Sequence, residues 1–194
     1  MYKRFICALL LLLFTVNTST YAKTAVLVIA HRDYQPTEYN DTKQLIEQAR
    51  ITVITASNKA GTAIGTDGSR TTVDKTVAEL NPDMYDGIFF IGGPGALGHL
   101  DNNTSYSILK KTAAKGKPFG AICISPRILA KAGVLTGKKA TGWDGDNKLA
   151  KIFHRHGVQY IRKNVGTVID GNIITATCPL AAQGFAKGII NLLK

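Results

Sequence analysis

The chain has 194 residues, 45% of them hydrophobic, so it is long enough for one domain with a sizeable core and too apolar to be disordered. Its formal net charge is +11, but the basic residues are scattered and form no stripe interleaved with aromatic residues. Nucleic-acid binding is therefore not expected.

Residues 1–22 have the pattern of a secretory signal peptide. Two basic residues open the segment, an apolar run extends from Phe5 to Val16, and a short polar stretch ends at Ala22. The run is shorter than the ~20 residues of a spanning helix, which favours cleavage after Ala22 over an uncleaved membrane anchor. We expect an exported, periplasmic protein without a stable membrane span, whose single domain at 23–194 has a net charge of 11 − 2 = +9.

Apolar runs rich in β-branched residues predict buried strands of a parallel sheet, and amphipathic segments between them predict helices. The predicted strands are 24–30, 51–56, 87–91 and 118–122, and the predicted helices are 37–50, 77–84, 102–115 and 127–132. Polar residues at 31–36 predict a loop after the first strand.

Three further segments complete the chain. The glycine- and threonine-rich stretch 58–76 predicts a small β excursion, either a hairpin or an extended segment. The turn Asp170-Gly171-Asn172 lies between two apolar segments and predicts a hairpin over 166–176. With helices expected at 148–156 and 183–193, the fold class is α/β: a flavodoxin-like, doubly wound parallel sheet with helices on both faces.

Cys123 follows a predicted buried strand directly and precedes a predicted helix. This arrangement favours an exposed, strained residue beside free backbone N–H groups, and it predicts a thiol with a lowered pKa. The alternative is a buried cysteine that only packs. The turn at Gly92 and the pair Trp143–Asp144 also follow strands, and ligand sites of such sheets lie at the carboxyl ends of their strands.

The sequence resembles the PfpI-type superfamily, which includes intracellular cysteine proteases, deglycases and glutathione-independent glyoxalases. The resemblance covers the chain from Val26 to Leu193. Its most specific segments are GAICISP at 120–126, GVLTGK at 133–138, FIGGPGA at 90–96 and VIDGNIIT at 168–175.

The resemblance implies a role for several residues. Cys123 would be the nucleophile and Glu38 the acid that shares a proton with it, with Asp33 as the alternative because the alignment slips near residues 31–36. Backbone N–H groups near Gly93 and at Ile124 would form an oxyanion hole. The remaining pocket residues implied are Gly92, Trp143, Asp144 and Pro179.

One departure affects the expected reaction. Protease members of the superfamily have a histidine directly after the cysteine, and this chain has Ile124 there. A Cys–His protease is therefore not expected, and the base is Glu38, Asp144 or absent. Small carbonyl or amide substrates remain, handled by a glyoxalase-like, deglycase-like or amide-hydrolysing thiol. The other interpretation is a stress or redox-sensing protein, or a chaperone-like one, in which Cys123 is oxidised.

Cys178 belongs to a segment, Thr177–Pro179, that the resemblance implies lies near the pocket mouth. In an oxidising compartment it is a candidate redox partner for Cys123. The resemblance also implies a homodimer. No cofactor or metal is expected, because His154 and His156 point to different sides of a helix. His31 and His99 follow strands and are weaker pocket candidates.

Overall fold

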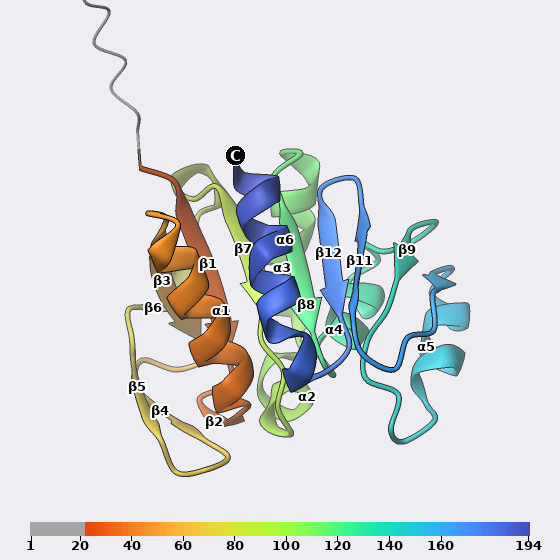
Figure 1. Cartoon of the computed structure of the whole chain (residues 1–194), viewed down its shortest axis with the longest axis horizontal. Helices are drawn as coiled ribbons and strands as arrows, with labels where there is room; N and C mark the ends of the chain where they lie inside the picture. Colours follow the sequence, from red (N-terminus) through yellow and green to blue (C-terminus); the bar gives the residue numbers. More distant parts are fainter. Residues whose placement is uncertain (1–21) are drawn as a thin grey trace, which may run out of the picture.

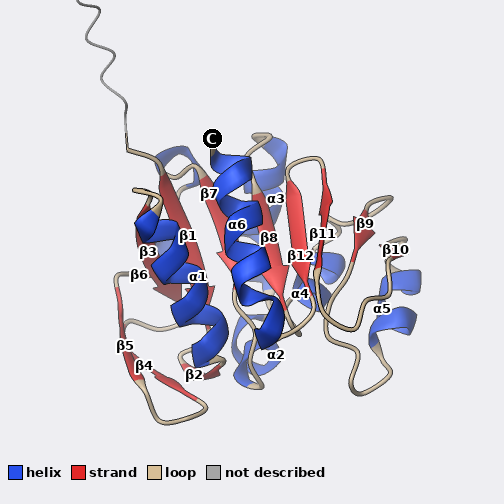
Figure 2. Cartoon of the chain, in the orientation of Figure 1, coloured by secondary structure: helices blue, strands red, loops and turns tan. Residues whose placement is uncertain are grey.

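A seven-stranded sheet forms the centre of the structure, a computed structural model that describes residues 22–194 (Figures 1 and 2). The strand order is β11-β12-β8-β7-β1-β3-β6. All neighbours are parallel except β11, which pairs antiparallel with β12 at one edge. The strands are β1 (Thr24–Ile29), β3 (Thr52–Ser57), β6 (Lys75–Thr76), β7 (Gly87–Phe90), β8 (Phe119–Ile122), β11 (Thr167–Asp170) and β12 (Ile173–Ala176).

Helices cover both faces of this sheet. Helices α1 (Pro36–Gln48) and α6 (Ala182–Leu193) pack side by side on the face that is toward the viewer in Figure 1. Helices α3 (Asn103–Ala114) and α4 (Pro126–Lys131) lie behind the sheet, while α2 (Gly95–Leu100) and α5 (Leu149–Arg155) lie near its ends. The expected doubly wound α/β fold is thereby confirmed.

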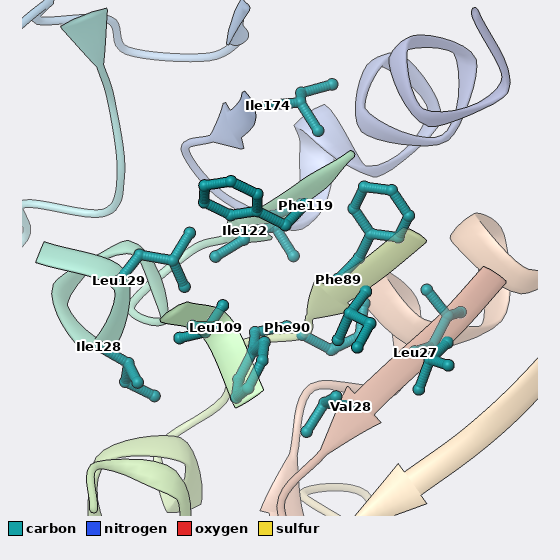
Figure 3. Close-up of a cluster of buried hydrophobic side chains, with 14 of the residues drawn as sticks. Leu27, Val28, Phe89, Phe90, Leu109, Phe119, Ile122, Ile128, Leu129 and Ile174 are labelled. Carbon is teal, nitrogen blue, oxygen red and sulfur yellow. The ribbon is translucent and has the colours of Figure 1, made fainter. Parts of the chain in front are cut away.

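The core consists of the apolar runs that predicted the strands. All five residues from Ala25 to Ile29 are fully buried, as are Phe89 and Phe90 (Figure 3). Phe89 contacts Phe185 of α6 edge-to-face, at a ring-centroid distance of 6.2 Å. Fully burying a side chain of this size contributes roughly 1.5–3 kcal/mol, so the central strands hold both layers together.

Short elements depart from the sequence-based expectations. The predicted loop 31–36 contains β2 (Arg32–Tyr34), which joins β4 (Gly61–Gly65) and β5 (Arg70–Val73) in a three-stranded sheet. This sheet is the predicted β excursion. The predicted helix 77–84 is instead two 3₁₀ turns, Val77–Glu79 and Pro82–Met84, because Pro82 interrupts any continuous helix. Helix α2 and the parallel pair β9 (Lys139–Ala140) and β10 (Gln159–Tyr160) were not predicted.

The signal peptide predicted at residues 1–22 falls almost wholly outside the described residues. Among residues 22–194, no helix is long and apolar enough to cross a membrane.

Candidate active site

Four chain segments meet at the carboxyl ends of the central parallel strands, at the lower edge of the sheet in Figure 1. Gly92 and Gly93 follow β7, Cys123 follows β8, and Cys178 follows β12. Glu38 lies in the first turn of α1, whose start is tied to the same edge because Gln35 donates its backbone N–H to Gly92 O at 3.0 Å. The parallel topology therefore gathers residues that are far apart in sequence.

Cys123 has a left-handed backbone conformation, with φ of +63°. A residue with a side chain adopts this conformation only at a cost, so the surrounding structure must hold it in place. Cys123 donates its N–H to Ala176 O at 2.9 Å and accepts from Trp143 N–H at 2.7 Å. Ser125, two residues on, donates its hydroxyl to Ile91 O at 2.8 Å. These bonds fix the sharp turn between β8 and α4, as the sequence predicted.

Glu38 is fully buried and faces the thiol of Cys123. Its Oε2 accepts a hydrogen bond from Gly92 N–H at 2.9 Å. Its Oε1 has no nitrogen or oxygen partner in the described part of the chain. The alternative acid, Asp33, lies on β2 and does not line the pocket. The structure thus places Glu38, not Asp33, against the cysteine.

Burial raises the pKa of Glu38 from 4.5 to about 7, against smaller opposing effects from hydrogen bonds to Cys123 and Gly92. Such a carboxyl exchanges protons near neutral pH. Burial likewise raises the pKa of the Cys123 thiol, and the adjacent Glu38 carboxylate raises it further. The lowered thiol pKa expected from the sequence is therefore wrong for a site with Glu38 ionised. When Glu38 keeps its proton, that repulsion is absent, so the two groups titrate as one pair.

Backbone N–H groups of Gly93 and Ile124 donate toward the Cys123 sulfur and lower the pKa of the thiol. Gly93 has a φ of +114°, and a Cβ added there would lie 2.5 Å from Asp33 O. Only glycine fits this turn, which directs its N–H into the site. The structure thus brings together the two donors that the sequence resemblance implied.

A pocket of about 510 Å³ opens above Cys123. Its walls are largely apolar, and Cys178 and Pro179 form part of them. Trp143 lines this pocket and also a smaller neighbouring cavity of about 270 Å³. The complete lining of the larger pocket is Gln35, Gly93, Pro94, Cys123, Ile124, Trp143, Asp146, Cys178 and Pro179.

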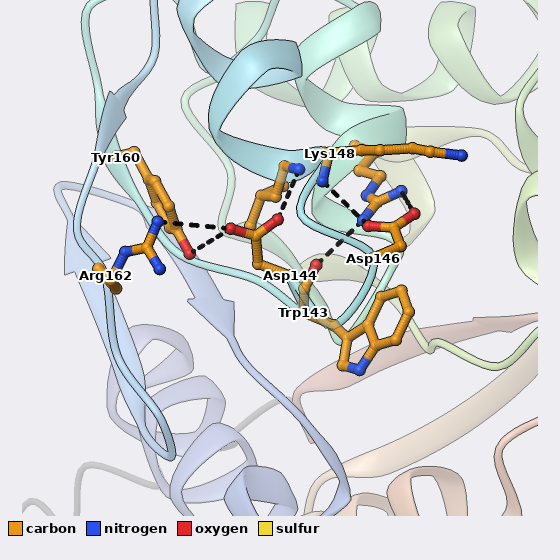
Figure 4. A network of polar contacts seen from close by, with 8 residues as sticks. Trp143, Asp144, Asp146, Lys148, Tyr160 and Arg162 are labelled. Atoms are coloured by element: carbon orange, nitrogen blue, oxygen red, sulfur yellow. Dashed lines mark hydrogen bonds and ion pairs between the residues drawn. The ribbon is translucent and has the colours of Figure 1, made fainter.

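Asp144 and Asp146 line two different cavities. Asp144 lines the neighbouring cavity, where its Oδ1 accepts from Leu149 N–H at 2.8 Å at the start of α5. Figure 4 shows its carboxylate directed toward Tyr160 and Arg162. Asp146 lines the Cys123 pocket, and its Oδ1 also accepts from Lys148 N–H at 3.2 Å. Asp144 is therefore not placed to act as a base on the thiol.

Arg127 is a residue that the sequence analysis missed. It is buried in the first turn of α4, and its guanidinium donates to both carboxylate oxygens of Asp146 and to Trp143 O. It also lies over the Trp143 ring, 5.6 Å from the ring centre. An arginine within the apolar segment that follows Cys123 was the available signal, because a buried arginine needs partners.

Histidine is absent from the pocket lining, and neither His31 nor His99 reaches it. Within residues 22–194, no three His, Cys, Asp or Glu side chains are grouped as metal ligands. The titratable groups that meet at the pocket are thus Cys123, Glu38, Asp146 and Cys178.

Comparison with known proteins gives one consistent result. Residues 23–192 match the DJ-1/PfpI family. An uncharacterized protein of Methanocaldococcus jannaschii is 34% identical over 170 residues, which are 87% of this chain and 82% of that protein. A deglycase of Pyrococcus horikoshii is 29% identical over 169 residues, which are 87% of this chain and 99% of that protein.

Solved structures agree on the fold. A ThiJ/PfpI domain protein from Brachyspira murdochii superposes with a TM-score of 0.82 at 24% identity, covering 89% of this chain and 96% of that one. DJ-1beta of Drosophila melanogaster gives a TM-score of 0.80 at 24% identity, covering 89% and 91%.

Proposed function

The chain belongs to the DJ-1/PfpI family, and from that premise we propose that it is a cysteine enzyme for small dicarbonyl compounds, with glyoxalase-like or deglycase-like activity. One observation carries the proposal: Glu38 is fully buried against Cys123 and has a pKa raised to about 7. A buried carboxyl of this kind suits proton transfer at neutral pH. The deglycase relative adds support from sequence.

The geometry suggests a sequence of steps for an α-oxoaldehyde. The Cys123 thiol gives its proton to Glu38, and the sulfur adds to the aldehyde carbon to form a hemithioacetal. The N–H groups of Gly93 and Ile124 stabilise the charge that develops beside them. Glu38 returns the thiol proton to the adduct's oxygen, and then moves a proton from that carbon to its neighbour, which gives a thioester. Water hydrolyses the thioester to a 2-hydroxy acid and frees the thiol.

The pocket favours this reaction over peptide cleavage. A cysteine protease needs a base that is later an acid for the leaving amine, and histidine is its usual choice. The described pocket has none, and its walls are mostly apolar. A small amide remains the second candidate substrate, because Glu38 alone can supply one proton to a leaving amine.

Methylglyoxal tests the proposal. We expect the protein to convert it to lactate, Cys123→Ser to abolish turnover, and Glu38→Gln to lower kcat by roughly 10²–10⁴-fold while Cys123 still alkylates. Glu47→Gln is the matched control, because Glu47 is an exposed residue of the same helix. Full turnover by Glu38→Gln would overturn the proposal.

Location and assembly are part of the proposal. We propose that the protein acts in the periplasm after removal of residues 1–22, and that it is a homodimer. We place Leu180 in this interface: it follows Pro179 of the pocket and is 81% exposed. Mass analysis of the exported chain and its sedimentation would test the two points separately.

A further inference from the structure

We propose that Cys178 is a resolving thiol for Cys123: a hydroperoxide oxidises Cys123 to a sulfenic acid, and Cys178 converts it to a disulfide across the pocket. This inference rests on Cys123 as the reactive thiol of the proposed site, but not on dicarbonyl chemistry. It adds a second, peroxide-reducing reaction to the pocket.

The register of the sheet brings the two cysteines together. Ile122 of β8 and Ala176 of β12 are direct partners in a parallel pair, and Cys123 donates its N–H to Ala176 O at 2.9 Å. Neighbouring strands lie about 4.8 Å apart. Cys123 is one residue beyond this pair and Cys178 is two residues beyond it on the adjacent strand. Both then line the same pocket of about 510 Å³.

Neither cysteine is in a disulfide, and both are partly exposed. The pair is asymmetric, however. The turn at Cys123 is fixed by backbone bonds to Ala176 and Trp143, and only Cys123 has Glu38 and the two N–H donors beside its sulfur. Cys178 has one weak side-chain contact, to the Thr177 hydroxyl at 3.5 Å. Cys123 is thus equipped to attack, and Cys178 to resolve.

The surface position of Cys178 allows the movement that a disulfide requires. Cys178 has an extended backbone and precedes the single 3₁₀ turn Pro179–Ala181, which includes the exposed Leu180. Disulfides need Cα atoms within about 7 Å and matched side-chain directions. A rotation of the Cys178 side chain, with a small shift of its turn, supplies this match while the Cys123 turn stays in place.

The chemistry balances with the groups present. Cys123 gives its proton to Glu38, its sulfur attacks the terminal peroxide oxygen, the O–O bond breaks, and the leaving alkoxide takes the proton from Glu38. The Cys178 sulfur then attacks the sulfenic sulfur, the S–O bond breaks, and the leaving hydroxide takes the Cys178 proton to form water. Two thiols lose two electrons, and the hydroperoxide becomes an alcohol and water. An external dithiol returns the disulfide to two thiols.

Intact mass after peroxide tests the proposal, with Cys7→Ser in every sample so that only Cys123 and Cys178 report. After one equivalent of hydrogen peroxide and alkylation without reduction, we expect a loss of about 2 Da, no alkylation, and a 123–178 cross-linked peptide. In Cys178→Ser the first equivalent stops at the sulfenic acid, and after a second equivalent of hydrogen peroxide we expect a gain of about 32 Da at Cys123, as a sulfinic acid that dithiothreitol does not reverse.

Two results would overturn this inference: wild-type Cys123 gaining oxygen while Cys178 remains alkylatable, or dithiothreitol recovery equal in the wild type and Cys178→Ser. The proposed function fails separately, if methylglyoxal is not consumed by the reduced protein. A disulfide without dicarbonyl turnover would therefore keep this inference and reject the other.

Discussion

Arg127 and Asp146 form a bidentate ion pair, in which two guanidinium nitrogens lie 2.9 and 2.5 Å from the two carboxylate oxygens. The pair joins the helix that follows Cys123 to the wall of the Cys123 pocket. Because Arg127 also donates to Trp143 O and lies over its ring, it sets the position of the largest wall residue. The position of Trp143 thus depends on Arg127, four residues after Cys123.

Replacing Arg127 by methionine should loosen this wall. Trp143 is the only tryptophan, so its fluorescence reports the change directly. We expect a red-shifted emission, stronger quenching by acrylamide, and a KM raised on the order of tenfold, since charge-assisted hydrogen bonds contribute about 1.5–3 kcal/mol. Arg127→Lys keeps the charge but not the bidentate geometry, so its emission and KM should lie between those of the wild type and Arg127→Met. Unchanged emission in Arg127→Met would refute the positioning role.

Gly92→Ala should disrupt the acid–thiol pair. A Cβ at this position would lie 2.5 Å from Cys123 Cβ and 2.7 Å from Glu38 Oε2. We expect a loss of turnover and a free energy of unfolding lowered by about 1–3 kcal/mol, measured by urea denaturation. Gly98→Ala is the control, because no atom beyond its chain neighbours and its own helix backbone lies within 4 Å of its added Cβ. The control should be neutral or slightly stabilising.

Glu38 should make stability depend on pH in one direction. Its pKa is about 7 in the folded protein, above the ordinary value of 4.5, so the folded state binds this proton more tightly than the unfolded state does. Stability should therefore fall as pH rises from about 4.5 to about 7, by an amount on the order of 3 kcal/mol. Glu38→Gln should lose this slope. Denaturation midpoints at several pH values measure it, and parallel profiles of the two proteins would contradict the expectation.

Asp144→Ala should affect folding more than chemistry. Asp144 accepts from Leu149 N–H at the start of α5 and lies outside the Cys123 pocket. We expect the free energy of unfolding to fall by about 0.5–2 kcal/mol, as for the loss of a helix cap, with methylglyoxal turnover unchanged. A fall in kcat at unaltered stability would restore Asp144 as a candidate base.

The larger parts of the fold could be predicted because buried strands have a recognisable sequence pattern. Thr24–Ile29, Gly87–Phe90 and Phe119–Ile122 are continuous apolar runs, and each is a central strand. The two-residue strands β9 and β10 have no such apolar run, since Lys139 and Gln159 are exposed. Their pairing depends on tertiary contacts that no local pattern records.

The site was predicted less completely, because sequence fixes which residues are near the strand ends but not where side chains point. Asp144 and Asp146 are two positions apart, and only the structure separates the helix cap from the pocket wall. The thiol pKa was misjudged for a related reason. A helix start lowers the pKa of a thiol, but burial and the Glu38 charge raise it.

The strand order also governs how the site assembles during folding. Glu38 and Gly93 precede Cys123 in the chain, but the carbonyl that holds the Cys123 turn belongs to Ala176, on a strand made almost last. Parallel pairing between β8 and β12 is non-local and so forms slowly. An incomplete chain therefore lacks the bond that holds the Cys123 turn, and the turn described here is complete only once the C-terminal strand has docked.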